Sequence, residues 1–352
     1  MRYRFLSDGK TAVSEVGFGV WSVATTWWGV KDAETGVRLL REAYDQGVTF
    51  FDTADVYGNG RGETLLADAF WKSGVPRDNL VIATKFGYDI YTNSGERSGH
   101  GELPQDFSPA FIKKACEESL RRLSTDHIDI YQLHNPRMDA IRSDDIIETL
   151  ERLKDEGKIR LGGAALGPDI GWFDEGMETL ARDGYDAIQI IYSLLEQEPS
   201  IGFFPSAEQK NRNLIVRVPH ASGLLDRSYK PENAYDKSDH RSHRKDKWMA
   251  AGVDAVRQFE FLESTIGPTR RLLSQAAIQF CLAQPTVKTV LPNFTRTDQI
   301  KEFCAASDLP PLTKDDLARV RKLWDDGLGS SLIQPFSNSI TKPSPVAAAG
   351  RG

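Results

Sequence analysis

Three features are scarce in this sequence of 352 residues, and each scarcity excludes a class of protein. Cysteine occurs only at Cys116, Cys281 and Cys304, without a Cys-x-x-Cys pair, so we expect neither a disulfide framework nor a zinc cluster. No run of about 18 apolar residues is present, so we expect no membrane-spanning helix. Basic residues are outnumbered by acidic ones, and the net charge of −6 argues against nucleic acid as the principal partner.

The composition that remains is typical of a soluble globular protein, with 40% hydrophobic and 27% charged residues. The first residues, Met1 to Asp8, turn polar too soon to hold the apolar core of a secretion signal. We therefore expect a cytoplasmic protein. Neither the substrate nor the oligomeric state follows from the sequence.

Short apolar runs alternate with longer amphipathic segments along most of the chain, which is typical of repeated βα units around a parallel sheet. Eight runs are nearly continuous in hydrophobicity, as strands buried on both faces are. They begin near Val16, Val48, Leu80, Ile128, Ile159, Ala187, Leu214 and Val287. Eight strands predict an α/β fold, a single (β/α)8 TIM barrel over residues 1–336, followed by a flexible tail at 337–352.

Helices and a hairpin are predicted around these strands. Helical spacing of apolar residues covers Asp32–Gln46, Gly62–Lys72, Ser108–Leu123, Ser143–Glu156 and Thr269–Ala283. Asp32, Ser108 and Ser143 are suitable N-caps. Before the first barrel strand, an Asp8-Gly9 step predicts a β-hairpin that could close the barrel floor.

Two long segments interrupt this rhythm, and loop insertions in barrels often set specificity. Residues 87–107 form a polar, glycine-rich loop after the third strand, for which we favour a substrate lid. Residues 226–248 are charged and precede a helix predicted at Met249–Thr265.

Four polar residues, Asp52, Tyr57, Lys85 and His134, follow three successive predicted strands, at the barrel edge where chemistry takes place. A tyrosine is a poor acid at neutral pH unless a cation stabilises its phenolate. Lys85 can supply that cation while Asp52 holds the lysine, which makes Tyr57 a general acid. His134 can align a substrate carbonyl. Each residue alone is explained equally well as an ordinary residue at the end of a strand, but the four together predict a carbonyl reductase site.

The segments 51–58, 80–87 and 128–136 together resemble the aldo-keto reductase family. The resemblance implies that Asp52, Tyr57, Lys85 and His134 are catalytic. It also implies NADP(H), with NAD(H) as the alternative, bound in extended form without a Rossmann domain. No Gly-x-Gly-x-x-Gly motif is present.

The resemblance further implies a set of cofactor contacts. Gln189 corresponds to the glutamine on the nicotinamide carboxamide, Tyr192 to the aromatic residue under the ring, and Trp21 to an aromatic residue of the first loop. Ser222, Gly223 and Leu224 fall in the pyrophosphate segment. Arg296, Gln299 and Glu302 fall in the adenosine segment, where Arg296 is the candidate for a 2′-phosphate.

Three positions depart from the family pattern. Ala165 and Leu166 replace a serine and an asparagine that hold the carboxamide, at a loss of about 0.5 to 1.5 kcal/mol for each hydrogen bond. Phe303 replaces the asparagine after Glu302. The catalytic half is therefore closer to the family pattern than the cofactor half.

The leading hypothesis is an oxidoreductase acting on a small aldehyde, ketone, sugar-like carbonyl or alcohol. One alternative is a redox-neutral epimerase or lyase with tightly bound NADP, and another is a non-catalytic, dinucleotide-sensing regulatory subunit. A metal-dependent hydrolase is disfavoured, because His134 is at a strand end and His220, on the seventh strand, is the only further candidate there. His240 and His243 are better explained as part of a charged loop than as metal ligands.

Overall fold

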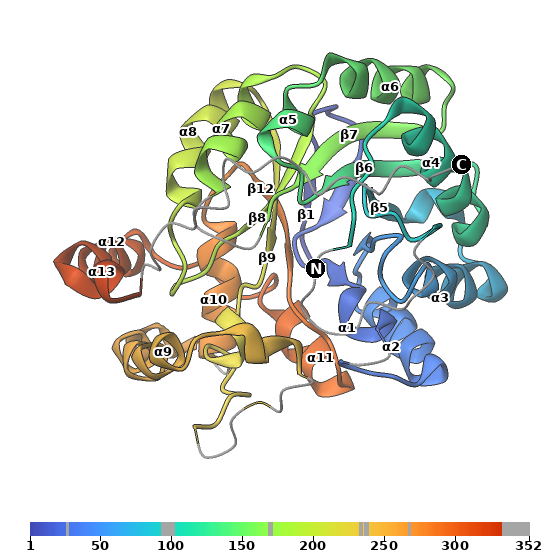
Figure 1. The fold of residues 1–352 in the computed structure, drawn as a ribbon. Coiled ribbons are helices and arrows are strands. Elements are labelled where there is room, and N and C mark those ends of the chain that lie inside the picture. The colour runs from blue at the N-terminus through green and yellow to red at the C-terminus, as the bar shows by residue number, and fades with distance from the viewer. Residues whose placement is uncertain are drawn as a thin grey trace.

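Eight parallel strands form a barrel, and helices lie around its outside (Figure 1). The computed structural model describes residues 1–25, 28–92, 103–167, 172–231, 235, 239–266 and 269–332. The strands are β3 (Phe18–Gly19), β4 (Phe50–Asp52), β5 (Val81–Phe86), β6 (Ile128–His134), β7 (Ile159–Ala165), β8 (Ala187–Ile191), β9 (Asn213–Arg217) and β12 (Val287–Leu291). A parallel bridge between Val16 and Val290 joins the two ends of the sheet. The predicted TIM barrel is confirmed, with each strand starting within two residues of its expected position.

The helices that follow the strands cover the barrel. They are α2 (Ala33–Asp45), α3 (Arg61–Phe70), α4 (Pro109–Leu123), α6 (Asp144–Asp155), α7 (Phe173–Ala181), α8 (Phe204–Gln209), α10 (Leu273–Leu282) and α11 (Thr297–Ala305). Asp32 accepts a hydrogen bond from the Thr35 amide at 2.8 Å, as expected of an N-cap. Ser143 precedes α6 at the N-cap position, but its side chain makes no capping hydrogen bond.

Further helices are α1 (Trp21–Ala24), α5 (Met138–Ile141), α9 (Asp246–Gln258), α12 (Lys314–Leu323) and α13 (Gly329–Leu332). Two helix predictions need correction. The helix expected from Met249 begins three residues earlier and ends at Gln258. The helix expected from Thr269 begins at Leu273, because residues 269–271 pair as strand β11 with β10 at residues 264–266.

The predicted N-terminal hairpin is present as β1 (Tyr3–Phe5) and β2 (Ala12–Ser14). Its residues Leu6 and Val13 are buried in one cluster with Phe50, Ile130 and Ile215 from the barrel interior. The hairpin therefore closes the amino-terminal end of the barrel, and the carboxyl ends of the strands remain for the site.

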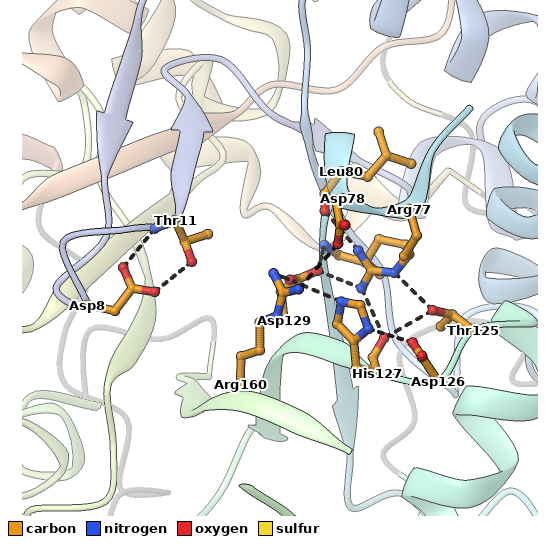
Figure 2. Close-up of polar contacts among 11 residues, drawn as sticks. Asp8, Thr11, Arg77, Asp78, Leu80, Thr125, Asp126, His127, Asp129 and Arg160 are labelled. Atoms are coloured by element: carbon orange, nitrogen blue, oxygen red, sulfur yellow. Dashed lines mark hydrogen bonds and ion pairs between the residues drawn. The ribbon is translucent and has the colours of Figure 1, made fainter. Parts of the chain in front are cut away.

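A polar cluster ties the strands together at the amino-terminal end, centred on the buried Asp129 of β6 (Figure 2). Asp129 accepts hydrogen bonds from Arg77 at 2.7 Å, from Arg160 of β7 at 2.8 Å and from the Ile82 amide of β5 at 2.8 Å. The aspartate thus links three neighbouring strands and the segment before β5. Polar groups at this end of such a barrel serve stability.

The C-terminal tail at 337–352 and the middle of the 87–107 segment lie outside the described residues. The flanks of that segment meet: Tyr88 and Gln105 form an antiparallel bridge, and Gln105 donates a hydrogen bond to the backbone oxygen of His134 at 2.8 Å. Within the described chain, no helix has the length and apolar character needed to cross a membrane.

Candidate active site

Lys85 on β5 is fully buried and contacts two of the other three residues expected to be catalytic. Its Nζ donates to Asp52 Oδ1 at 2.5 Å, to the Thr53 backbone oxygen at 2.7 Å and to the Tyr57 hydroxyl oxygen at 3.4 Å. Burial acts to lower the pKa of Lys85, but the charges and hydrogen bonds of Asp52 and Tyr57 outweigh it and raise that pKa. The lysine is therefore held as a cation beside a tyrosine hydroxyl.

Two hydrogen bonds to its second carboxylate oxygen hold Asp52 in place. Gln132 of β6 donates to Oδ2 at 3.2 Å, and Gln189 of β8 donates to the same atom at 2.9 Å. The aspartate thus accepts hydrogen bonds from three strands inside the barrel. Such a network sets the position of Lys85 before any substrate arrives.

Tyr57 stands between two aromatic groups at the barrel mouth. Its ring centroid lies 5.8 Å from the His134 ring and 4.6 Å from the Trp21 ring. His134 is nearly buried and also contacts the Tyr88 ring at 5.0 Å. The structure therefore brings Asp52, Tyr57, Lys85 and His134 into one site, with Trp21 forming one wall.

A cavity of about 440 Å³ lies beside this site, at the ends of β9 and β12. Ser222, Gly223, Arg296 and Gln299, all expected as cofactor contacts, line it. The segment after β9 is conformationally strained, because Val218, Ala221 and Ser222 adopt φ values of 61°, 47° and 59°. Strain of this kind concentrates at binding sites.

A glycine is required in this segment at position 223, where φ is 96°. A Cβ there would lie 2.5 Å from both Ser228 Oγ and the Tyr235 hydroxyl. Tyr235 in turn donates to the Ser222 backbone oxygen at 2.7 Å. The segment 222–223 is thus held as a narrow backbone cradle at the cavity wall.

Comparison with known proteins decides the family. The model described as "Aldo/keto reductase family" matches residues 15–325. Aldo-keto reductase YhdN of Bacillus subtilis is 32% identical to this chain over 244 residues, which are 69% of each protein. The uncharacterized oxidoreductase YqkF of the same organism is 29% identical over 318 residues, which are 90% of this chain and 94% of YqkF. The chain belongs to the aldo-keto reductase family. The solved structure of aldo-keto reductase AKR11C1 from Bacillus halodurans, in its holo form, agrees with a TM-score of 0.74 at 30% identity, covering 97% of this chain and all of that one.

Five residues expected to bind the cofactor in this aldo-keto reductase do not line the cavity. Trp21 and Gln189 contact Tyr57 and Asp52 of the catalytic group instead. The other three lie elsewhere. Tyr192 is buried outside the barrel against Phe204 and Phe280, because side chains alternate along a strand and Gln189 already faces inward. Leu224 is buried, and Gly252 of α9 packs against its side chain. The Glu302 carboxylate accepts a hydrogen bond from Ser274 of α10.

The cavity has further lining residues that the sequence did not single out for this role. Trp28 belongs to the first loop, and Asp239 and Arg241 belong to the charged 226–248 segment. The Trp28 side chain hydrogen-bonds Asp239, and Asp239 pairs with Arg241 at 2.7 Å. The charged segment therefore reaches across the cavity to the first loop. No local sequence pattern indicates this long-range contact.

Arg217, the last residue of β9, was also missed. Its guanidinium donates at 2.9 Å to the backbone oxygen of Leu166, one of the two residues that replace the family's serine and asparagine. Its inward orientation follows from the structure and not from a local sequence pattern, since Ile215 faces the barrel interior and Arg217 is two residues further along.

The described histidine side chains outside the catalytic group do not lie in a cluster of metal-ligating side chains. His220 is buried, its Nε2 lies 3.0 Å from the Ser274 backbone oxygen, and its ring packs on Phe303 at 4.4 Å. Among the residues whose placement is described, no group of three or more His, Cys, Asp or Glu side chains is arranged to hold a metal ion. The side chains of His240 and His243 lie outside the described set.

Proposed function

We propose that this aldo-keto reductase transfers a hydride between NADP(H) and a carbonyl or alcohol substrate, with Tyr57 as the general acid or base. The observation that carries the proposal is the buried Lys85 ammonium, 3.4 Å from the Tyr57 hydroxyl and 2.5 Å from Asp52. A fixed cation beside a phenol stabilises the phenolate that forms when the phenol gives up its proton.

The residues divide the work of carbonyl reduction. Tyr57 donates its hydroxyl proton to the carbonyl oxygen, and Lys85 stabilises the phenolate left behind. His134, whose ring lies 5.8 Å from that of Tyr57, orients the carbonyl oxygen toward the Tyr57 hydroxyl. In alcohol oxidation the same groups return the proton along the same path.

We assign the pyrophosphate and adenosine parts of an extended dinucleotide to the cavity beside the catalytic group. Its volume is within the usual range for ligand sites, the 222–223 cradle brings backbone close to a ligand, and Arg241 and Arg296 supply cations for phosphates. Bound there, the cofactor supplies the hydride. Arg296, exposed and paired with Asp298, is our candidate for the 2′-phosphate of NADP(H).

Preference for NADP(H) over NAD(H) is part of the proposal. Among the relatives, a Schizosaccharomyces pombe protein is named for NADP(+) and an Escherichia coli protein as an NADH-specific methylglyoxal reductase. The arginines at the cavity support NADP(H) here, because a 2′-phosphate adds charge that they can bind.

The test is a fluorescence titration of the purified protein with NADPH and with NADH, followed by a screen of aldehydes and ketones for NADPH oxidation. We expect saturable binding, tighter for NADPH, and net consumption of NADPH with at least one carbonyl compound. Product formation without net consumption would instead indicate the redox-neutral cycle. Binding without any turnover would favour a sensing role.

A further inference from the structure

His134, the last residue of β6, lies one residue beyond the ladder between β5 and β6, whose final pair is Phe86 with Leu133. The next residue, Asn135, leaves the strand with a φ of 50°. On the side of β7 the turn is held by a hydrogen bond of 2.9 Å from the Asn135 amide to the Ala165 oxygen. On the side of β5 the ladder has ended, so a different group must hold this turn.

Gln105 takes the place of β5 at the turn. Its side chain is buried, and its Nε2 donates to the His134 backbone oxygen at 2.8 Å and to the Asn135 backbone oxygen at 3.2 Å. Both partners are acceptors, so the amide nitrogen and not the amide oxygen must face them. One side chain thus supplies the donor that a further residue of β5 would have supplied.

Tyr88 contacts the same turn through its ring and its hydroxyl. The ring centroid lies 5.0 Å from that of His134, at an interplanar angle of 69°, and the hydroxyl oxygen accepts a hydrogen bond from Asn135 Nδ2 at 2.9 Å. The Tyr57 ring meets the same imidazole at 5.8 Å and 79°. Edge-to-face contacts depend on ring orientation, so the two tyrosines restrict the rotation of the imidazole.

Tyr88 and Gln105 lie opposite each other in the flanks of the 87–107 segment. An antiparallel bridge joins the two residues, and beside it the Asp106 amide donates to the Gly87 oxygen at 2.7 Å. Residues that are paired across two strands have their side chains on the same face. The two flanks therefore form a short stem that presents both side chains to His134.

We propose that Gln105 and Tyr88 are positioning residues, which hold the backbone and the imidazole of His134 in the direction that a substrate carbonyl requires. The inference rests on the proposed function, in which His134 orients the carbonyl oxygen. It gives the stem of the 87–107 segment a role in catalysis that needs no contact between the stem and the substrate.

The first test replaces Gln105 by methionine, which keeps the length of the side chain and removes the amide donor. We expect kcat for the best carbonyl substrate to fall by about 10- to 100-fold, because a small displacement of an aligning group is costly. The affinity for NADPH should be unchanged. Steady-state kinetics, a fluorescence titration and thermal unfolding measure these properties.

The matched control is Gln279→Met on α10. Gln279 is also buried, and its Nε2 likewise donates to backbone oxygens, among them those of Ala306 and Pro310, both at 3.0 Å. This variant should lose thermal stability, as Gln105→Met should, but it should keep the kcat of the wild type.

A second variant, Gln105→Glu, gives a readout that a purely structural role would not move. An ionised carboxylate has nearly the shape of the amide but no donor for the His134 oxygen, whereas a protonated carboxyl can donate one hydrogen bond. Burial raises the pKa of a carboxyl group at this position. We therefore expect kcat, as a fraction of the wild-type value at the same pH, to be low near about pH 8 and to recover as the pH falls to about 6.

A measurement without turnover separates failure of this inference from failure of the proposed function. NMR spectra of protein labelled with carbon-13 at histidine Cε1 report on each imidazole, and His134→Gln assigns the His134 signal. Gln105→Met should shift or broaden that signal, Tyr88→Leu should move it toward the position of a free histidine, and Gln279→Met should leave it unchanged. If these changes occur but no carbonyl compound is turned over, the proposed function alone is rejected.

Two results would overturn the inference. One is a kcat and a His134 signal that are the same in the wild type, in Gln105→Met and in Tyr88→Leu. The other is an equal loss of kcat in Gln105→Met and Gln279→Met, without recovery of Gln105→Glu at low pH, which would make Gln105 a source of stability only. If Gln105→Met does not fold, Gln105→Glu and Tyr88→Leu decide by the same two readouts.

Discussion

Lys85 is a buried cation whose charge is kept by the aspartate and the tyrosine that it contacts. The sequence predicted this trio, because each residue follows a strand and the strand ends of a parallel barrel meet at one edge. It did not predict that Gln132 would hydrogen-bond Asp52. That contact depends on the register between distant strands, which no local pattern contains.

Replacement of Tyr57 by phenylalanine tests the proposed proton donor. The change removes one hydroxyl and keeps the ring between Trp21 and His134. We expect turnover to fall by about 10²- to 10⁴-fold, while NADPH affinity stays near that of the wild type. Steady-state kinetics with the best carbonyl substrate, together with a fluorescence titration, measures both. A variant of nearly normal rate would exclude Tyr57 as the acid.

At the scale of elements, β8 and β9 show that the position of a strand was predictable and that the direction of its side chains was not. Both strands were expected, yet the side chain of Tyr192 lies outside the site to which it was assigned, and the orientation of Arg217 at the end of β9 was not predicted. Gln189 fixes the inward phase of β8, and that phase turns Tyr192 outward, against Phe280. The phase of a strand buried on both faces is not visible in its hydrophobicity, because both faces are apolar.

The segment after β9 supplies a prediction for Gly223→Ala. The added Cβ would meet Ser228 Oγ and the Tyr235 hydroxyl at 2.5 Å, at a φ of 96°. We expect NADPH affinity to fall by about tenfold, since the backbone of the cradle must widen or shift. The left-handed backbone conformation of the new alanine should cost a further ~1 kcal/mol in stability. Isothermal titration calorimetry measures the affinity.

The matched control is Gly74→Ala, at a φ of 75° with no atom within 4 Å of the added Cβ. It should show the backbone strain alone, as a small loss of thermal stability, with normal NADPH affinity. Equal affinities for the two variants would mean that the cradle does not bind the cofactor.

At the scale of the whole molecule, the barrel was predictable because each strand is a short apolar run with a helix after it. Eight parallel strands predict a closed barrel, and the bridge between Val16 and Val290 is the contact that closes it. The cavity wall was not predictable in the same way. Trp28 and Asp239 come from loops about 210 residues apart, and only the folded chain brings them together.

Asp129 at the amino-terminal end of the barrel supplies a stability prediction. Asp129→Asn removes a buried charge that Arg77 and Arg160 contact, which should lower the free energy of unfolding by about 2 to 4 kcal/mol. The kcat of the folded enzyme should be unchanged, because the catalytic residues lie at the opposite end. Urea unfolding and steady-state kinetics measure the two effects.

Asp126→Asn is the control for this substitution, since the Asp126 carboxylate is 91% exposed and contacts only the edge of the same cluster. It should change stability by less than about 1 kcal/mol. A similar small effect of Asp129→Asn would show that the cluster is not a source of stability.

The distance between the Asp129 cluster and the catalytic end also bears on how such a protein changes over generations. Substitutions in the loops after the strands alter substrate preference, whereas the contacts that join β5, β6 and β7 lie at the other end (Figure 2). New activities can therefore be sampled without weakening the scaffold at each step.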